Sequence, residues 1–103
     1  MDLCVTTYEV TEGFPGHELY GLTSQMRRAA VSIPCNIAEG SARSSEKESA
    51  QFYNIARASL SELDTQIEIA NRLKYIGADA NAKLDAMMID VDRCLYGLWK
   101  KKR

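Results

Sequence analysis

Apolar residues recur at steps of three and four along most of the chain, which is the spacing of one face of an α-helix. The longest such run covers residues 45–77. Its apolar stripe consists of Phe52, Ile55, Ala56, Leu60, Leu63, Ile67, Ala70 and Leu73. Ser45 and Glu48 have the spacing of a capping box, in which each side chain binds the other's backbone N–H. Gly77 is the expected C-terminal stop, because glycine adopts the left-handed conformation without strain.

A second helical run covers residues 23–40 and contains a proline in mid-pattern. Its stripe consists of Met26, Ala29, Ala30, Ile33 and Ile37. Pro34 has no N–H, and its ring crowds the carbonyl of Ala30, so we expect a bend of roughly 20° or more. Thr23 or Ser24 is the expected N-cap, unless Pro15 opens an earlier first turn. Gly40 is the expected C-cap of this helix.

Two further helices complete the pattern. Residues 79–102 carry a clear stripe, with Asp79 as the expected N-cap, and residues 2–12 carry a weaker one that Gly13 would end. No sustained alternation of apolar and polar residues indicates a strand. Four helices joined by short turns predict an all-α fold, an antiparallel up-down four-helix bundle with a proline-kinked second helix. The third helix outlasts the first, so part of its stripe is an expected self-association surface.

The length and composition fit one soluble domain. The chain has 103 residues, 46% hydrophobic and 26% charged, and we treat residues 1–103 as a single bundle domain with a basic tail at 100–103. No apolar stretch approaches the roughly 18 residues of a membrane span. The first residues lack the basic and apolar regions of a signal peptide, so the expected location is cytoplasmic, without a membrane partner.

Known catalytic and cofactor patterns are missing from the sequence. Three cysteines at wide spacing and the single histidine, His17, match no familiar zinc pattern, so we expect small, buried, reduced thiols. There is no Glu-x-x-His, P-loop or dinucleotide glycine motif, and no supported Ser-His-Asp arrangement. We therefore expect no enzyme activity, no cofactor, no metal and no small-molecule substrate.

An ordered series of short motifs spans most of the chain. It runs F-P at 14–15, E-x-Y-G-L-T-x-Q at 18–25, R-R-A at 27–29, S-I-P-x-N-I-A-E-G at 32–40 and S-x-x-E-L at 59–63. Over roughly residues 8–98 the chain thereby resembles the four-helix bundle family of 23S rRNA intervening-sequence proteins. The resemblance implies a small bundle that assembles into a homo-oligomeric ring, commonly a pentamer. It supplies no catalytic residue.

The resemblance also bears on partners. A distantly similar bundle is an accessory protein of diversity-generating retroelements, where it partners a reverse transcriptase and RNA. The chain departs from the family pattern in a shorter first helix, which puts the contacts of that helix in doubt. It also has Cys35 where members usually carry another small residue, and this difference should matter little.

The segment around Pro34 supports two interpretations. Asn36 and Glu39 are three residues apart and share a helix face, and Glu39 and Arg43 are four apart and can pair. The cluster either contacts a partner or neighbouring subunit, or satisfies backbone groups freed by the proline and the turn. We favour the second, because such side-chain-to-backbone bonds are common beside helix breaks. The candidate interface or structural residues are Ser32, Pro34, Asn36, Glu39 and Gly40.

Charge is unevenly distributed although the net charge is only −1. Residues 1–20 carry four acids and no base, and residues 62–92 carry seven acids and three bases. The candidate phosphate contacts are Arg27, Arg28, Arg43, Lys47 and Arg57, to which the tail would add non-specific attraction. In a hairpin, Arg28 and Arg57 would lie at similar heights. The alternative is a solvated face with salt bridges to Glu46, Glu48 and Glu62.

Together these patterns predict a non-enzymatic, oligomeric binding or scaffold protein that contacts RNA, or an RNA-bound protein, through a basic surface. The alternative is a structural self-assembly protein with a protein-only partner, in which the polar cluster only builds the subunit interface.

Overall fold

Four α-helices and one short 3-10 helix make up the computed structural model, which describes residues 1–102 and the side chains of residues 1–101. The helices are α1 (Asp2–Thr11), η1 (Gly16–Glu18), α2 (Leu22–Ala42), α3 (Glu46–Arg72) and α4 (Ala78–Lys102). No strand occurs in residues 1–102, and the prediction of an all-α fold is confirmed. The molecule measures 43 × 25 × 18 Å along its principal axes.

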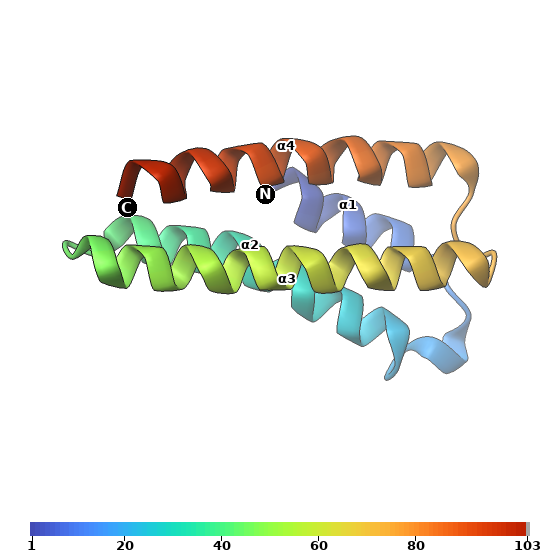
Figure 1. Cartoon of the computed structure of the whole chain (residues 1–103). Helices are drawn as coiled ribbons and strands as arrows, with labels where there is room; N and C mark the ends of the chain where they lie inside the picture. The colour runs from blue at the N-terminus through green and yellow to red at the C-terminus, as the bar shows by residue number, and fades with distance from the viewer. Residues whose placement is uncertain (103) are drawn as a thin grey trace.

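The long helices lie side by side, and the short one bridges two of them. α3 packs along both α2 and α4, and α1 contacts α2 and α4 (Figure 1). The α2–α3 turn and the C-terminus lie at one end of the molecule, while the connections 12–21 and 73–77 lie at the other. α1 is shorter than the other α-helices and covers only part of this length. The rest of α2 and α4 therefore does not lie against α1.

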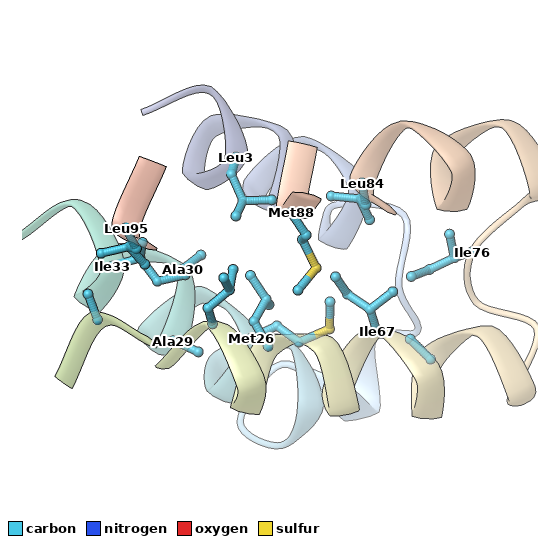
Figure 2. Packing of buried hydrophobic residues seen from close by; sticks show 14 of the residues in the cluster. Leu3, Met26, Ala29, Ala30, Ile33, Ile67, Ile76, Leu84, Met88 and Leu95 are labelled. Atoms are coloured by element: carbon cyan, nitrogen blue, oxygen red, sulfur yellow. The ribbon is translucent and has the colours of Figure 1, made fainter. Parts of the chain in front are cut away.

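One hydrophobic core joins all four α-helices. Figure 2 shows Leu3 of α1, Met26 of α2, Ile67 of α3 and Leu84 of α4 pointing into the space between the helices. The apolar spacing in the sequence therefore predicted most of the buried positions. It was wrong at Leu73, which is half exposed because α3 ends one residue before it, and at Ile55, which is exposed to nearly the same degree.

The start of α3 agrees with the sequence, but its end does not. The Ser45 hydroxyl accepts a hydrogen bond from the Glu48 backbone N–H at 3.3 Å, as predicted for the cap. Gly77 is not the stop, because α3 ends at Arg72 and Lys74 adopts the left-handed conformation with φ 64°. The N–H of Lys74 bonds the Asn71 carbonyl at 3.0 Å. The N–H of Tyr75 bonds the Ala70 carbonyl at 2.9 Å, which completes a Schellman motif.

The expected caps of α2 were also wrong. α2 begins at Leu22, before Thr23 and Ser24, and its first N–H is bound by the Glu18 Oε1 atom at 3.3 Å. A carboxylate from η1 thus does what a local hydroxyl was expected to do. Pro15 precedes η1 rather than opening α2.

The remaining predicted boundaries shift by one or two residues. α4 begins at Ala78, so Asp79 is not the N-cap but lies in the first turn, where its charge complements the helix dipole. α1 ends at Thr11, two residues before Gly13. α2 continues through Pro34 and past Gly40 to Ala42, so Gly40 is not a C-cap.

Candidate functional site

The polar residues around Pro34 join α2 to α3. The hydroxyls of Ser32 and Ser59 share a hydrogen bond of 2.8 Å. The Asn36 Nδ2 atom donates to the Ser32 carbonyl at 2.8 Å and to the Ser32 hydroxyl at 2.9 Å. Asn36 therefore serves the carbonyl one turn before it, and not the Ala30 carbonyl that faces the proline ring. These bonds fix the height of α2 against α3.

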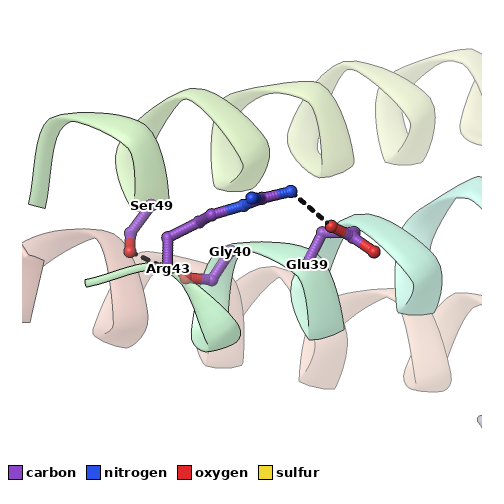
Figure 3. Close-up of polar contacts among 4 residues, drawn as sticks. All are labelled: Glu39, Gly40, Arg43 and Ser49. Atoms are coloured by element: carbon purple, nitrogen blue, oxygen red, sulfur yellow. Dashed lines mark hydrogen bonds and ion pairs between the residues drawn. The ribbon is translucent and has the colours of Figure 1, made fainter. Parts of the chain in front are cut away.

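Gly40 lies where α2 and α3 approach each other closely. A Cβ atom at this position would lie 2.6 Å from the Cε1 atom of Tyr53 and 3.1 Å from the Cβ atom of Phe52. The Ser49 hydroxyl donates to the Gly40 carbonyl at 2.7 Å, as Figure 3 shows. The Tyr53 hydroxyl is held by Ser41 at 3.0 Å. Gly40 therefore serves the close packing of α2 against α3 from inside α2, and it does not terminate the helix.

The predicted pair between Glu39 and Arg43 is confirmed. The Arg43 Nη2 atom lies 2.7 Å from the Glu39 Oε2 atom (Figure 3), and the Arg43 guanidinium stacks over the Phe52 ring at 4.9 Å. Both charged side chains are about half exposed, and exposed pairs of this kind contribute at most about 1 kcal/mol. The pair therefore orders the start of the α2–α3 turn and leaves its outer side open to a partner.

Arg27 is engaged by α1. Its Nε atom donates to the Thr11 hydroxyl at 2.9 Å, and its Nη2 atom donates to the Tyr8 carbonyl at 3.4 Å. The guanidinium also lies 4.7 Å from the centre of the Tyr8 ring. These contacts direct Arg27 toward α1, so it does not belong to the surface of the α2–α3 hairpin on which we expected phosphate contacts.

The groove that Arg28 lines and the side chain of Arg57 lie on different sides of α3. Arg28 lines a groove of about 400 Å³ between α2 and α3, together with Ser59 and Glu62. Arg57 precedes Ser59 by two residues, a rotation of about 200° around the helix, and lies about 7.5 Å along the axis from Glu62. The expectation that the two arginines lie at similar heights is therefore wrong. The hairpin is offset relative to a count of residues from its turn.

Figure 1 shows the α2–α3 turn and the C-terminus at one end of the molecule, and the helix bounds place six basic residues in this half. We call this the basic end, and it consists of Arg43, Lys47, Arg57, Arg93, Lys100 and Lys101. Residues 29–61 and 93–101 form this half and carry six basic and three acidic side chains, a formal charge of +3. Residues 1–28 and 62–92 carry five basic and eleven acidic side chains, a formal charge of −6.

The sequence reasoning found only part of this group. Arg43, Lys47 and Arg57 are predicted phosphate contacts and the tail is predicted to add attraction, whereas Arg93 is not among the predicted contacts. The tail falls partly outside the described residues, because the side chain of Lys102 and the whole of Arg103 are not described. The available clue was the predicted topology, because in an antiparallel arrangement of four helices the last helix would end beside the turn between the second and the third.

A second groove, of about 330 Å³, runs between α3 and α4. Its charged lining consists of Asp64 on α3 and of Asp85, Asp92 and Arg93 on α4, and its floor includes Leu60 and Met88. The two walls continue toward the basic end, because Arg57 lies seven residues before Asp64 on α3 and Tyr96 lies four residues after Asp92 on α4. Beyond the lined part of the groove, the two helices therefore carry Arg57 and Tyr96 on these stripes in place of aspartates.

Two groups have a pKa displaced from the ordinary range. The hydrogen bond that the Tyr75 hydroxyl donates to Glu18 at 3.0 Å raises the pKa of that tyrosine. Burial raises the pKa of the Cys4 thiol, which favours the protonated form. Cys35 and Cys94 are exposed, so the expectation of three buried thiols is wrong for both. Each lies beside the buried stripe of its helix and points away from the core.

Within the described residues, no group of three His, Cys, Asp or Glu side chains is placed to hold a metal ion. A search of the same part of the chain finds no helix with the length and apolar character needed to cross a membrane.

Comparison with known proteins identifies one family. The family model described as 23S rRNA-intervening sequence protein matches residues 1–97 of the chain. None of the curated proteins compared with the chain matches it.

Proposed function

The chain belongs to the 23S rRNA-intervening sequence protein family, and from this premise we propose a non-enzymatic, oligomeric binding or scaffold protein. In this proposal the basic end contacts RNA or an RNA-bound protein. The protein acts in the cytoplasm and needs no cofactor and no small-molecule substrate. Its four helices form an antiparallel up-down bundle in which α2 bends at Pro34, because the proline removes one backbone hydrogen bond.

The observation that carries the proposal is the separation of charge along the molecule. One half has a formal charge of +3 and the other −6, although the whole chain, which includes Lys102 and Arg103, carries only −1. A molecule of this kind orients its basic end toward a polyanion, and clustered Lys and Arg side chains are the groups that neutralise phosphates. In the described part of the chain, Lys47 and Arg57 are exposed and have no carboxylate partner.

The proposed phosphate contacts differ from those chosen on sequence alone. Arg43, Lys47 and Arg57 are kept, and Lys100 and Lys101 join them at the same end. Arg93 is not included, because Asp64, Asp85 and Asp92 line the same groove as its side chain. Arg27 is left out because it binds α1, and Arg28 is left out because Glu62 lines the same groove.

Self-association is the second part of the proposal. Several large apolar side chains are exposed in the single chain: Val5, Leu19, Tyr20, Val31, Ile55, Ile69, Leu73 and Ile89. Burial of such side chains between copies is favourable, and the family resemblance suggests a ring of five. A ring would repeat the basic end around its axis and strengthen the attraction of a polyanion.

The test is RNA binding by the purified protein over a salt series, with the assembly state recorded in the same buffers. We expect the logarithm of the affinity to fall linearly with the logarithm of the salt concentration, because several phosphates are neutralised. The charge reversal Lys47→Glu should weaken binding about tenfold and reduce the salt slope. The matched control is Lys83→Glu, an exposed lysine of α4 in the acidic half, which should have little effect.

Two results would contradict the proposal. If RNA does not bind at low salt while the oligomer is intact, the protein is a self-assembly protein with a protein-only partner. If Lys47→Glu dissociates the oligomer and has no direct effect on the affinity for RNA, the basic end is a subunit interface. The Lys83→Glu control shows whether an effect is specific to the basic end or follows from the change in net charge.

A further inference from the structure

An aromatic pair lies at the basic end. The ring centres of Tyr96 and Trp99 are 6.3 Å apart with an angle of 36° between the ring planes. Tyr96 is 55% exposed, and Trp99 is partly exposed. The two rings are three residues apart in the sequence and directly precede Lys100 and Lys101. The fold adds Arg57, which comes from α3, to the same half of the molecule.

The rings continue the wall of the α3–α4 groove. Asp92 lines that groove, and Tyr96 and Trp99 follow it by four and seven residues, so all three share one stripe of α4. On the facing helix, Ser61 and Asp64 line the groove, and Arg57 precedes them by four and seven residues. The end of the groove is therefore bounded by an arginine on α3 and two rings on α4.

Stacking surfaces beside cations are the chemistry that binds single-stranded nucleic acid. Every base presents an apolar face that can stack on a tyrosine or tryptophan ring, and the backbone phosphates between bases attract Arg and Lys. A duplex does not offer these faces, because its bases stack on one another. The acidic half of the groove would repel a strand that extended past Asp92, which limits the contact to the basic end.

We propose that this end of the groove binds single-stranded RNA, with bases stacked on Tyr96 and Trp99 and phosphates held by Arg57 and Lys100. The inference rests on the proposed function and makes it narrower, since it states both the form of the RNA and the residues that touch its bases. A basic and aromatic helix end also suits an anionic membrane surface. We favour RNA because the two rings follow the stripe of α4 that lines the α3–α4 groove, and because Trp99 is partly covered rather than fully exposed.

The test uses the single tryptophan as its own probe. Trp99 is the only tryptophan of the chain, so its fluorescence reports on the site itself. We would titrate the full chain with a 12-nucleotide oligouridylate and with a 12-base-pair RNA duplex. We expect the single strand to quench the fluorescence and to bind at least about tenfold more tightly than the duplex.

Substitutions at Tyr96 separate stacking from charge. Tyr96→Ala should weaken single-strand binding about tenfold with an unchanged salt slope, because it removes a stacking surface and no charge. Tyr96→Phe keeps the ring and should bind like the unmodified chain. The matched control is Tyr20→Ala, which truncates a tyrosine that is 93% exposed at the opposite end and should leave binding unchanged. Denaturation midpoints of all three variants verify that each is folded.

The outcomes distinguish this inference from the proposed function. If RNA binds with a steep salt dependence but Tyr96→Ala has no effect, or the duplex binds equally well, the inference is wrong and the proposed function stands. If neither RNA binds at low salt, both are wrong. If vesicles of phosphatidylcholine with 30% phosphatidylserine shift the Trp99 emission and the oligouridylate does not, the end is a membrane contact and the inference is overturned.

Discussion

At the scale of single residues, Gly40 shows how one position can matter to the contact between two helices. The missing side chain lets α2 approach Tyr53, a core residue only 1% exposed whose hydroxyl is tied to Ser41. The Tyr53 ring is buried, and its hydroxyl is bonded to Ser41, so the ring cannot move aside. An added methyl group at position 40 must therefore displace the helix backbone. Gly97 in α4 is the opposite case, because nothing lies within 4 Å of the position of its Cβ atom.

We therefore predict opposite effects of the same substitution at two helical glycines. Gly40→Ala should lower the free energy of unfolding by about 1–3 kcal/mol through overpacking, which outweighs the better helix propensity of alanine. Gly97→Ala should raise it by about 0.5–1 kcal/mol, because only the propensity changes. Urea denaturation of both variants measures the difference. An equal or greater stability of Gly40→Ala would show that the close approach is relaxed in solution.

At the scale of the elements, one carboxylate connects three segments. The Glu18 side chain in η1 accepts a hydrogen bond from the first N–H of α2 at 3.3 Å and another from the Tyr75 hydroxyl at 3.0 Å. Tyr75 follows the left-handed Lys74, so the Schellman turn directs its ring back toward Phe14, with a ring separation of 5.3 Å. The two connections at this end of the molecule are thus held against each other.

This link makes stability depend on pH at alkaline values. The hydrogen bond to Glu18 raises the pKa of Tyr75 in the folded state above its unfolded value near 10. The folded chain therefore holds the proton more tightly, so the stabilisation is complete below about pH 10 and is lost as pH rises through the raised pKa. Tyr75→Phe should be less stable than the unmodified chain at pH 8, with the gap closing above pH 10 in thermal denaturation. A gap that does not change between these pH values would contradict the assignment.

At the scale of the whole molecule, a single small core supports four helices. For a domain of 103 residues the total free energy of unfolding is on the order of 5–15 kcal/mol, so one well-buried side chain is a large part of it. Leu63 of α3 is completely buried between α2 and α4, whereas Ile69 of the same helix is 45% exposed. α3 makes the most extensive contacts with other helices, so its core residues should matter most.

We predict that Leu63→Ala lowers the free energy of unfolding by about 2–5 kcal/mol, because it leaves a cavity that the helices fill only in part. For a domain of this size the melting temperature should fall by about 10 °C or more. Ile69→Ala on the same helix should cost less than about 1 kcal/mol. Thermal unfolding followed by circular dichroism measures both. Equal losses in the two variants would indicate that Ile69 is covered by another copy of the chain.

The sequence by itself determined the features that depend on residues close together in the chain. The spacing of apolar residues predicted four helices and most of the core, because a helix repeats every 3.6 residues wherever it lies. The Ser45 cap and the Glu39–Arg43 pair were predicted for the same reason, since each joins residues three or four positions apart. The uneven charge was also visible, but only as blocks along the chain.

The tertiary structure alone decided which side chains meet across helices. Arg28 lines a groove with Glu62, and Arg57 lies five residues, or about 7.5 Å, before Glu62 on α3. A step of two residues also turns the Arg57 side chain by about 200° from Ser59, so Arg28 and Arg57 separate although a hairpin count places them together. The end of α3 at Lys74 follows from the contacts of Tyr75 and the buried Ile76, which outweigh the glycine at position 77. Offset and rotation depend on the packing of all four helices, and no local pattern in the sequence records them.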